Sequence, residues 1–194
     1  MGGSDGSGGV EVWVVRHGET EWSRDGLHTS RTELSLTPVG EDSAKALRRR
    51  LAGEHFDLVL TSPRERARRT CELAGFAGEA EVEPGLVEWD YGVYEGRSTA
   101  EIRETEPGWS VWTHPMPQGE TLDEVAARAD AVIDRLQGSD GRALLFSHGH
   151  FLRILAARWL CQPAALGKHL VLHTGTVSAL GWERDVPALQ SWND

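Results

Sequence analysis

Four short stretches of the chain carry residue types that together could bind and transfer a phosphoryl group. They are Arg16-His17-Gly18-Glu19-Thr20, Ser62-Pro63-Arg64-Glu65-Arg66, residues 88–96 and Ser147-His148-Gly149. A phosphate monoester carries roughly −1.5 to −2 charges near neutral pH, so a nucleophile approaches it against strong repulsion. Arginine side chains reduce that repulsion because they neutralise and orient the phosphate oxygens through paired hydrogen bonds. The four stretches therefore predict phosphoryl-transfer chemistry.

Each stretch can supply one part of such a site. Arg16 and Arg66 are the candidate phosphate-binding arginines. His17 is the candidate nucleophile, because a neutral imidazole attacks well near its ordinary pKa of about 6.5 when its other ring nitrogen keeps a hydrogen-bonded proton. His148 can supply a further positive or hydrogen-bonding group. Glu88 can protonate the leaving alkoxide and later accept a proton from water.

A metal site is the alternative for the second histidine motif. His148 and His150 stand two positions apart and could ligate zinc, but no aspartate or cysteine cluster accompanies them at metal-ligand spacing. We therefore predict no metal and no cofactor. The remaining histidines have no comparable context and are predicted to be surface or packing residues: His28, His55, His114, His169 and His173.

The two cysteines, Cys71 and Cys161, lie far apart in helical patterns, which favours free buried thiols over a disulfide. Neither has an arginine six positions later, which excludes a cysteine-dependent phosphatase. The formal charge of −10 argues against a nucleic-acid-binding protein, although a few focused arginines can still attract a small phosphorylated substrate.

The 194-residue chain fits one domain, predicted over residues 10–194. The first nine residues, MGGSDGSGG, lack a basic or apolar run and predict a flexible tail, not a signal peptide. No apolar stretch reaches the length of a membrane span, so a cytoplasmic protein is expected. A homodimer is left open.

Short apolar runs alternate with helical patterns along the chain. Residues 10–15 predict a buried strand that ends at Arg16 and His17. Two further buried strands are predicted over residues 56–60 and 143–146. Two edge strands are predicted over residues 176–182 and 188–192. This alternation predicts a three-layer α/β/α sandwich with a mostly parallel sheet. Ligands of such sheets bind beyond the carboxyl ends of the strands, which is where Arg16-His17 and Ser147-His148 are expected.

Helix signals separate these strands. Thr37 and Pro38 open one helix, which Gly53 closes. Capping boxes are predicted at Ser62/Glu65, Ser98/Glu101 and Thr121/Glu124, and residues 151–160 form a strongly apolar helix. Residues 84–120 lack apolar periodicity but are rich in aromatics, which could form a small satellite core or cover a pocket.

In this order and spacing, the four stretches closely resemble the histidine phosphatase superfamily, which is phosphoglycerate mutase-like in fold. The family carries Arg-His-Gly after the first strand and Ser-His-Gly near the end, and the resemblance covers residues 10–182. It implies that Arg16, His17, Arg66 and His148 form the phosphate pocket and that Glu88 is the proton donor. The substrate-binding residues that follow from the same motifs and from the aromatic segment are Thr20, Ser23, Thr29, Ser30, Trp89, Tyr91 and Gly149.

Departures from the mutase pattern favour a phosphatase. Family mutases carry asparagine at the position of Ser23, Thr-Gly at Thr29-Ser30, and a longer basic insertion after the proton-donor segment. Here residues 97–120 contain two arginines, Arg97 and Arg103, and four glutamates. This excess of negative charge predicts that the segment repels a second phosphate. The resemblance thus implies a metal-independent histidine acid phosphatase that hydrolyses a small phosphorylated metabolite through a phosphohistidine. The alternatives are mutase-type phosphoryl transfer and a catalytically silent phospho-ligand-binding scaffold, which would need no proton donor.

Overall fold

A computed structural model describes residues 9–138 and 141–194, so the predicted tail, apart from Gly9, lies outside the described residues. One six-stranded sheet has the order β3-β2-β4-β1-β5-β6. Its strands are β1 (Glu11–Arg16), β2 (Leu58–Thr61), β3 (Glu81–Val82), β4 (Arg142–Ser147), β5 (Val177–Glu183) and β6 (Val186–Ser191). Strands β1 to β4 run parallel, and β5 and β6 are antiparallel additions. The mostly parallel sheet is confirmed. The prediction of two edge strands is wrong for β5, which pairs with β1 on one side and β6 on the other.

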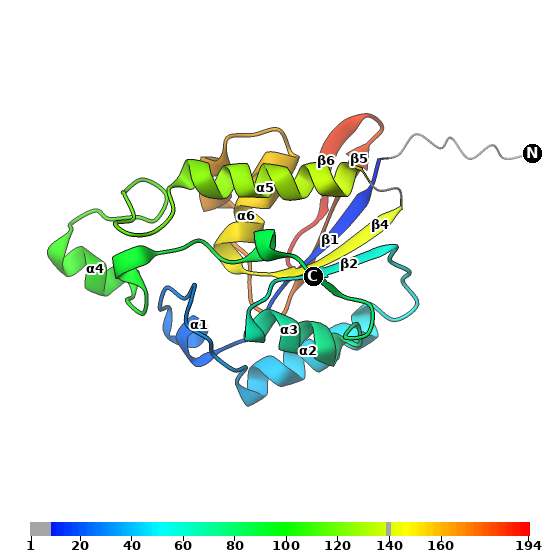
Figure 1. Cartoon of the computed structure of the whole chain (residues 1–194), viewed down its shortest axis with the longest axis horizontal. Coiled ribbons are helices and arrows are strands. Elements are labelled where there is room, and N and C mark those ends of the chain that lie inside the picture. Colours follow the sequence, from blue (N-terminus) through cyan, green and yellow to red (C-terminus); the bar gives the residue numbers. More distant parts are fainter. Residues whose placement is uncertain (1–8, 139–140) are drawn as a thin grey trace, which may run out of the picture.

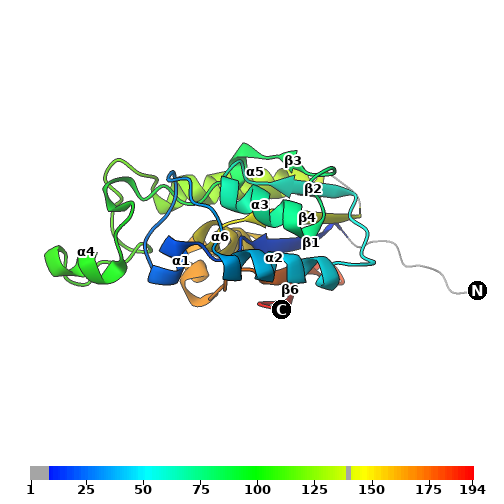
Figure 2. The same cartoon turned by 90° about the horizontal axis from the view of Figure 1, so that it is seen from below.

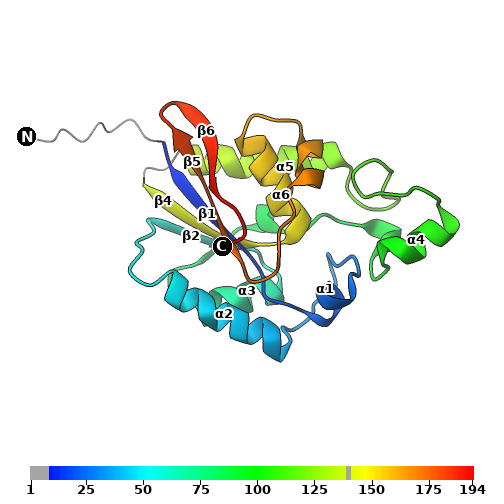
Figure 3. The same ribbon diagram turned by 180° about the vertical axis from the view of Figure 1, so that it is seen from behind.

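Helices cover both faces of the sheet, as the three-layer prediction required (Figures 1 and 3). On one face lie α2 (Pro38–Arg50) and α3 (Glu65–Ala74), and on the other α5 (Leu122–Gln137) and α6 (Gly149–Trp159). Alternate residues of β1 supply the two cores. Val12 and Val14 pack with the α5/α6 side, whereas Trp13 and Val15 pack with the α2/α3 side. This period of two is the strand pattern that a sheet buried on both faces requires.

Two of the three predicted capping boxes are present, at Ser98/Glu101 before α4 (Thr99–Thr105) and at Thr121/Glu124 before α5. The third prediction is wrong. Helix α3 begins after Arg64 without a side-chain cap, and the Ser62 hydroxyl instead contacts His148 Nε2 at 2.8 Å. A tertiary contact in the site has therefore replaced the local one.

Several element ends differ from the sequence prediction. Helix α2 ends at Arg50, before Gly53, and α6 begins at Gly149, directly after the histidine motif. Cys71 is buried as expected, but Cys161 is exposed, so the prediction of two buried thiols is wrong for it. Within residues 9–138 and 141–194, no helix combines the length and apolarity needed to cross a membrane.

The aromatic segment 84–120 forms a lobe rather than a regular layer. It holds α4 and two 3-10 turns, and α4 extends beyond the sheet on the side where α1 (Glu21–Asp25) lies (Figures 1 and 2). The buried aromatics of the segment join the α5/α6 core; they are Trp89, Tyr91, Tyr94 and Trp109. Tyr91 and Trp112 also line a cavity. Both predicted roles, satellite core and pocket wall, are thus combined in one segment.

Candidate active site

A cavity of about 380 Å³ opens at the carboxyl ends of β1 and β4, and its floor is formed by residues of the sequence motifs. Predicted site residues that line it are Arg16, His17, Ser23, Thr29, Glu88, Tyr91 and Gly149. The other predicted residues are buried and are not among those that line the cavity: Thr20, Ser30, Arg66, Trp89 and His148.

His17 follows β1 directly, and its side chain is 5% exposed. Its Nδ1 donates a hydrogen bond to the carbonyl oxygen of Gly18 at 2.8 Å. A carbonyl can only accept, so this contact keeps the proton on Nδ1 and leaves a lone pair on Nε2. Burial, reinforced by the nearby Arg66 and Arg16, holds the pKa of His17 well below its usual value. The ring is therefore neutral and nucleophilic at neutral pH.

The loop that carries His17 is fixed by two glycines in close contact. A Cβ atom on Gly40, in the first turn of α2, would lie 2.1 Å from the carbonyl oxygen of Glu19. A Cβ on Gly18 would lie 2.5 Å from the carbonyl oxygen of Gly40. The Gly18 N–H also donates to Thr70 Oγ1 at 2.9 Å. Helices α2 and α3 thus hold the loop that carries His17, and neither glycine has room for a side chain.

Arg66 projects from α3 and is fully buried. Its amino groups donate to the carbonyl oxygens of Thr29 at 3.2 Å, Ser30 at 3.1 Å and Thr32 at 3.1 Å. Arg16, at the end of β1, donates to the carbonyl oxygen of Leu172. Among the described residues, neither arginine forms an ion pair, and the Nε atom of each is buried without a hydrogen-bond partner. Two fixed positive charges therefore face His17.

His148 lies beside His17, with ring centroids 5.2 Å apart. Its Nε2 contacts the Ser62 hydroxyl, and its buried Nδ1 has no partner within the described chain. Burial is the main cause that holds the pKa of His148 well below its usual value. The next residue, Gly149, makes this packing possible, because a Cβ there would lie 3.1 Å from Arg16 Cζ. The first turn of α6 thereby contacts the Arg16 guanidinium directly.

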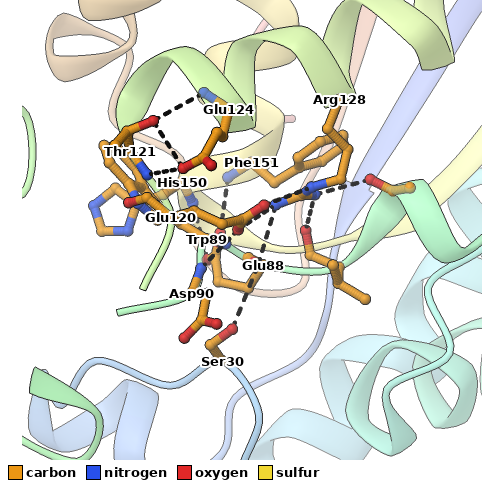
Figure 4. A network of polar contacts seen from close by, with 12 residues as sticks. Ser30, Glu88, Trp89, Asp90, Glu120, Thr121, Glu124, Arg128, His150 and Phe151 are labelled. Carbon is orange, nitrogen blue, oxygen red and sulfur yellow. Dashed lines mark hydrogen bonds and ion pairs between the residues drawn. The ribbon is translucent and has the colours of Figure 1, made fainter. Parts of the chain in front are cut away.

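Glu88 is held by the N-terminus of α6 (Figure 4). Its carboxylate accepts hydrogen bonds from the backbone N–H groups of Trp89 at 2.9 Å, His150 at 3.0 Å and Phe151 at 2.8 Å. Free N–H groups and the helix dipole make this position favourable for an anion. Arg128 braces the segment from the other side through the carbonyl of Val87 at 2.7 Å and an ion pair with Glu120 at 2.8 Å. The carboxylate is consequently fixed at the cavity wall.

The residues predicted to bind substrate fall into two groups. Ser23, Thr29, Tyr91 and Gly149 line the cavity. Thr20, Ser30 and Trp89 do not, and each has a structural contact instead. Thr20 caps α1 with Ser23, the Ser30 N–H binds the Glu95 carboxylate at 2.9 Å, and Trp89 Nε1 donates to the Glu120 carbonyl at 2.8 Å. These three residues shape the wall from behind.

Sequence reasoning missed several cavity residues. His28, predicted to be a surface or packing residue, lines the cavity while packing on Tyr91 at 4.7 Å and Trp109 at 5.3 Å between ring centroids. Arg103 also lines it, although it belongs to the glutamate-rich segment that was predicted to repel a second phosphate. Arg153 follows Gly149 by four positions on α6, and that i, i+4 spacing was a signal available in the sequence.

The histidines considered for a metal site have other partners. His148 contacts Ser62, and His150 Nδ1 contacts the Tyr91 hydroxyl at 2.6 Å. Over residues 9–138 and 141–194, no group of three or more histidine, cysteine or acidic side chains is arranged to hold an ion.

A model of the histidine phosphatase superfamily (branch 1) matches residues 12–194. The chain belongs to this superfamily. An acid phosphatase of Mycobacterium tuberculosis is 43% identical over 180 residues, covering 91% of this chain and 88% of that protein. A sedoheptulose 1,7-bisphosphatase of Saccharomyces cerevisiae is 36% identical over 178 residues, covering 75% of this chain and 66% of that protein. The solved structure of a Mycobacterium tuberculosis open reading frame gives a TM-score of 0.89 at 39% identity, covering 95% of this chain and 97% of that one.

The buried histidines of this histidine phosphatase should make its stability depend on pH. Burial lowers the pKa of His28 to about 4, from 6.5 in the unfolded chain. Below about pH 6.5 the unfolded state binds a proton that the folded state does not, so stability falls as the pH drops toward about 4. Between about pH 7 and about pH 5, the wild type should lose on the order of 1–2 kcal/mol more unfolding free energy than His28→Gln.

Urea unfolding at the two pH values measures this difference. The exposed His55 supplies the control, and His55→Gln should follow the wild type. If His28→Gln loses as much stability as the wild type, burial does not hold His28 neutral.

Proposed function

We propose that this chain is a metal-independent histidine acid phosphatase, which hydrolyses a small phosphorylated metabolite through a phosphohistidine on His17. The observation that carries the proposal is the neutral His17 ring. Its Nδ1 proton is held by the Gly18 carbonyl, its Nε2 has no hydrogen-bond partner among the described residues, and the charges of Arg66 and Arg16 act on it. Phosphatases among the superfamily relatives support the same assignment.

In the first half of the reaction, Arg16, Arg66 and His148 bind the oxygens of the transferred phosphate. His17 Nε2 attacks phosphorus, a P–N bond forms, and the bond from phosphorus to the leaving oxygen breaks. Positive groups that are already in place stabilise the charge that spreads over the phosphate oxygens without further reorganisation. Glu88, in its protonated form, gives its proton to the leaving alkoxide.

In the second half, water attacks the phosphohistidine. Glu88, now a carboxylate, accepts a proton from this water, and the P–N bond breaks to release inorganic phosphate and neutral His17. The two steps return every group to its initial protonation state. The fixed contacts of Glu88 with the start of α6 suit this double role, because they hold the carboxyl group in one place throughout.

His17→Ala should abolish turnover of an aryl phosphate while the protein stays folded. Because attack is by nitrogen, acid-labile and base-stable phosphate should accumulate on His17 of the wild type after denaturing quench, also in buffer that contains EDTA. Mass spectrometry of the quenched peptide measures this. His55→Ala should behave like the wild type. Substantial turnover by His17→Ala would exclude His17 as the nucleophile, and loss of the phosphoenzyme on chelation would overturn metal independence.

Glu88→Gln should slow the substrate with the poorer leaving group more. General acid catalysis contributes about 10²–10⁴-fold, and an alkyl phosphate needs that proton more than an aryl phosphate with an acidic leaving group. Comparison of kcat/KM for an alkyl and an aryl phosphate in both proteins measures the difference. Equal losses on the two substrates would show that Glu88 positions substrate and donates no proton.

Phosphoglycerate mutase-type transfer is the alternative function, and the presence of Arg103 and Arg153 in the cavity makes it worth testing. A mutase must shield its phosphohistidine from water. The cavity rim here is exposed at Gly26 and Arg103, so we expect water to reach the phosphoenzyme. With 3-phosphoglycerate and catalytic 2,3-bisphosphoglycerate, inorganic phosphate should form and 2-phosphoglycerate should be negligible by ³¹P NMR. Faster formation of 2-phosphoglycerate would replace the phosphatase assignment with a mutase.

A further inference from the structure

Arg128, on α5, does not line the cavity, and the proposed reaction does not use it. Its side chain is 17% exposed, and each of its three nitrogens donates at least one hydrogen bond (Figure 4). The acceptors are backbone carbonyls of residues 85–88 and the carboxylate of Glu120. All recorded hydrogen bonds of this guanidinium therefore go to the Glu88 segment or to Glu120.

Arg128 and Glu120 form a two-point ion pair. Arg128 Nε donates to Glu120 Oε1 at 3.1 Å, and Nη2 donates to Oε2 at 2.8 Å. Two parallel hydrogen bonds fix the orientation of the planar guanidinium against the planar carboxylate. The Glu120 side chain is 26% exposed, so most of the pair is withdrawn from the solvent that weakens surface ion pairs. The pair can therefore hold other groups in place.

The backbone before Glu88 is held by Arg128 itself. Nη1 donates to the carbonyl oxygens of Gly85 at 2.9 Å and Val87 at 2.7 Å. Residues 87–90 are described but belong to neither a helix nor a strand, so their polar groups depend on partners from elsewhere in the protein. Arg128 provides such a partner directly before Glu88.

The backbone after Glu88 is held by Glu120. The Asp90 N–H donates to the Glu120 carboxylate at 2.9 Å, and the Glu120 N–H donates to the Asp90 carbonyl at 2.9 Å. The same carboxylate is bound by Arg128. One ion pair thus fixes the chain on both sides of Glu88, within two residues in each direction.

Arg128 also contacts the helix that binds the Glu88 carboxylate. The guanidinium carbon lies 4.8 Å from the centroid of the Phe151 ring, a cation–π contact. The N–H of Phe151 donates to Glu88 Oε1 at 2.8 Å. A single side chain therefore contacts both the backbone that carries Glu88 and the turn of α6 that receives its carboxylate.

A second ion pair joins the same two helices without touching this segment. Arg158 of α6 donates to Asp130 of α5 at 2.8 Å and 3.0 Å, and its remaining amino group donates to the Gln162 carbonyl. Among the described residues, Arg158 makes no hydrogen bond to residues 85–90. It matches Arg128 in joining α5 to α6 and differs from it in having no contact with the Glu88 segment.

We propose that the Arg128–Glu120 pair positions Glu88 for proton transfer, so that this pair, remote from the cavity, determines how well the enzyme expels poor leaving groups. The inference deepens the proposed function and rests on it for the role of Glu88 as proton donor. The proton still passes from Glu88 to the leaving oxygen, and Arg128 is a positioning residue. Small displacements of a proton donor are costly, because a misplacement of about 1 Å can cost on the order of 10²-fold in rate.

The test measures kcat and KM for phenyl phosphate and p-nitrophenyl phosphate, which are similar in shape but differ in the acidity of the leaving group. The variants are Arg128→Gln, Arg128→Lys and Glu120→Gln, each alone and combined with Glu88→Gln. Arg158→Gln is the matched control. Amide hydrogen exchange at His150 and Phe151, measured by NMR, reports independently of turnover whether Glu88 still binds the start of α6.

Arg128→Gln and Glu120→Gln should each lose about 10-fold or more in kcat/KM for phenyl phosphate beyond any loss on p-nitrophenyl phosphate. The loss should fall on kcat, since neither residue lines the cavity. Arg128→Lys should recover part of it, because lysine keeps the charge without the paired geometry. With Glu88→Gln already present, the ratio between the two substrates should not change further, and Arg158→Gln should leave it unchanged.

The two amides that bind Glu88 should exchange about 10-fold or more faster in Arg128→Gln and Glu120→Gln than in the wild type or Arg158→Gln. If Arg128→Gln does not fold, Glu120→Gln carries the test, because it keeps the shape of the side chain and removes only its charge.

Equal losses on the two substrates, or wild-type exchange at both amides, would overturn the proposal, and so would a further change of the substrate ratio in the Glu88→Gln background. If Glu88→Gln alone slows both substrates equally, Glu88 donates no proton and the proposed mechanism loses that step. The amide exchange then still decides whether Arg128 and Glu120 position Glu88.

Discussion

The structure of this site depends on positive charge that is buried without a carboxylate partner. Arg16 and Arg66 are satisfied in part by backbone carbonyls, and the buried Nε of each has no partner among the residues that the structure describes. Carbonyl dipoles reduce the cost of desolvating a cation but do not cancel its charge, so the pocket stays electropositive. Two consequences follow. His17 and His148 are driven toward their neutral forms, and a phosphate dianion is the ligand that best completes the pocket. The Glu88 carboxylate attracts both arginines, but its hydrogen bonds go to the backbone at the start of α6, and among the described residues it forms an ion pair with neither arginine.

The parallel pairing of β1 with β4 brings the two halves of this pocket together. Arg16 lies opposite Ser147 in the register, so the residues that follow each strand, His17 and His148, emerge side by side although they are far apart in the chain. Close packing then fixes them, because Gly149 admits the Arg16 guanidinium and Gly18 admits the first turn of α2. The position of His17 is therefore determined by backbone contacts, which are less adaptable than contacts between side chains.

Glu88 occupies the N-terminus of α6, a position that in many proteins binds phosphate directly. Since the His150 and Phe151 N–H groups of that helix are bound to Glu88, an anion in the cavity would be neutralised by the arginine and histidine side chains. Helix α6 contributes in a different way, because it fixes the positions of residues that contact different parts of the cavity. His148 precedes it, Gly149 contacts Arg16, and Arg153 lies one turn further on. One helix thus sets the spacing between the Glu88 carboxylate, Arg16 and Arg153.

Residues whose role follows from local pattern and sheet topology could be predicted from the sequence, and residues whose role depends on a distant partner could not. The strand runs before His17 and His148 placed both at the carboxyl edge of one sheet, as observed.

Ser62 shows the limit of this reasoning. Its spacing to Glu65 is that of a capping box, but the buried ring of His148 lies within hydrogen-bond reach of the same hydroxyl. Water can satisfy the N–H groups of a helix end at the surface, but a buried histidine nitrogen needs a partner inside the protein. The Ser62 hydroxyl therefore contacts His148 and does not cap the helix. His28 and Arg103 line the cavity while contacting distant aromatic residues: His28 packs on Tyr91 and Trp109, and Arg103 donates to the Trp109 carbonyl. The cluster around His17 was accordingly foreseeable from short motifs, while the outer cavity residues emerged only from how the aromatic lobe packs on the sheet.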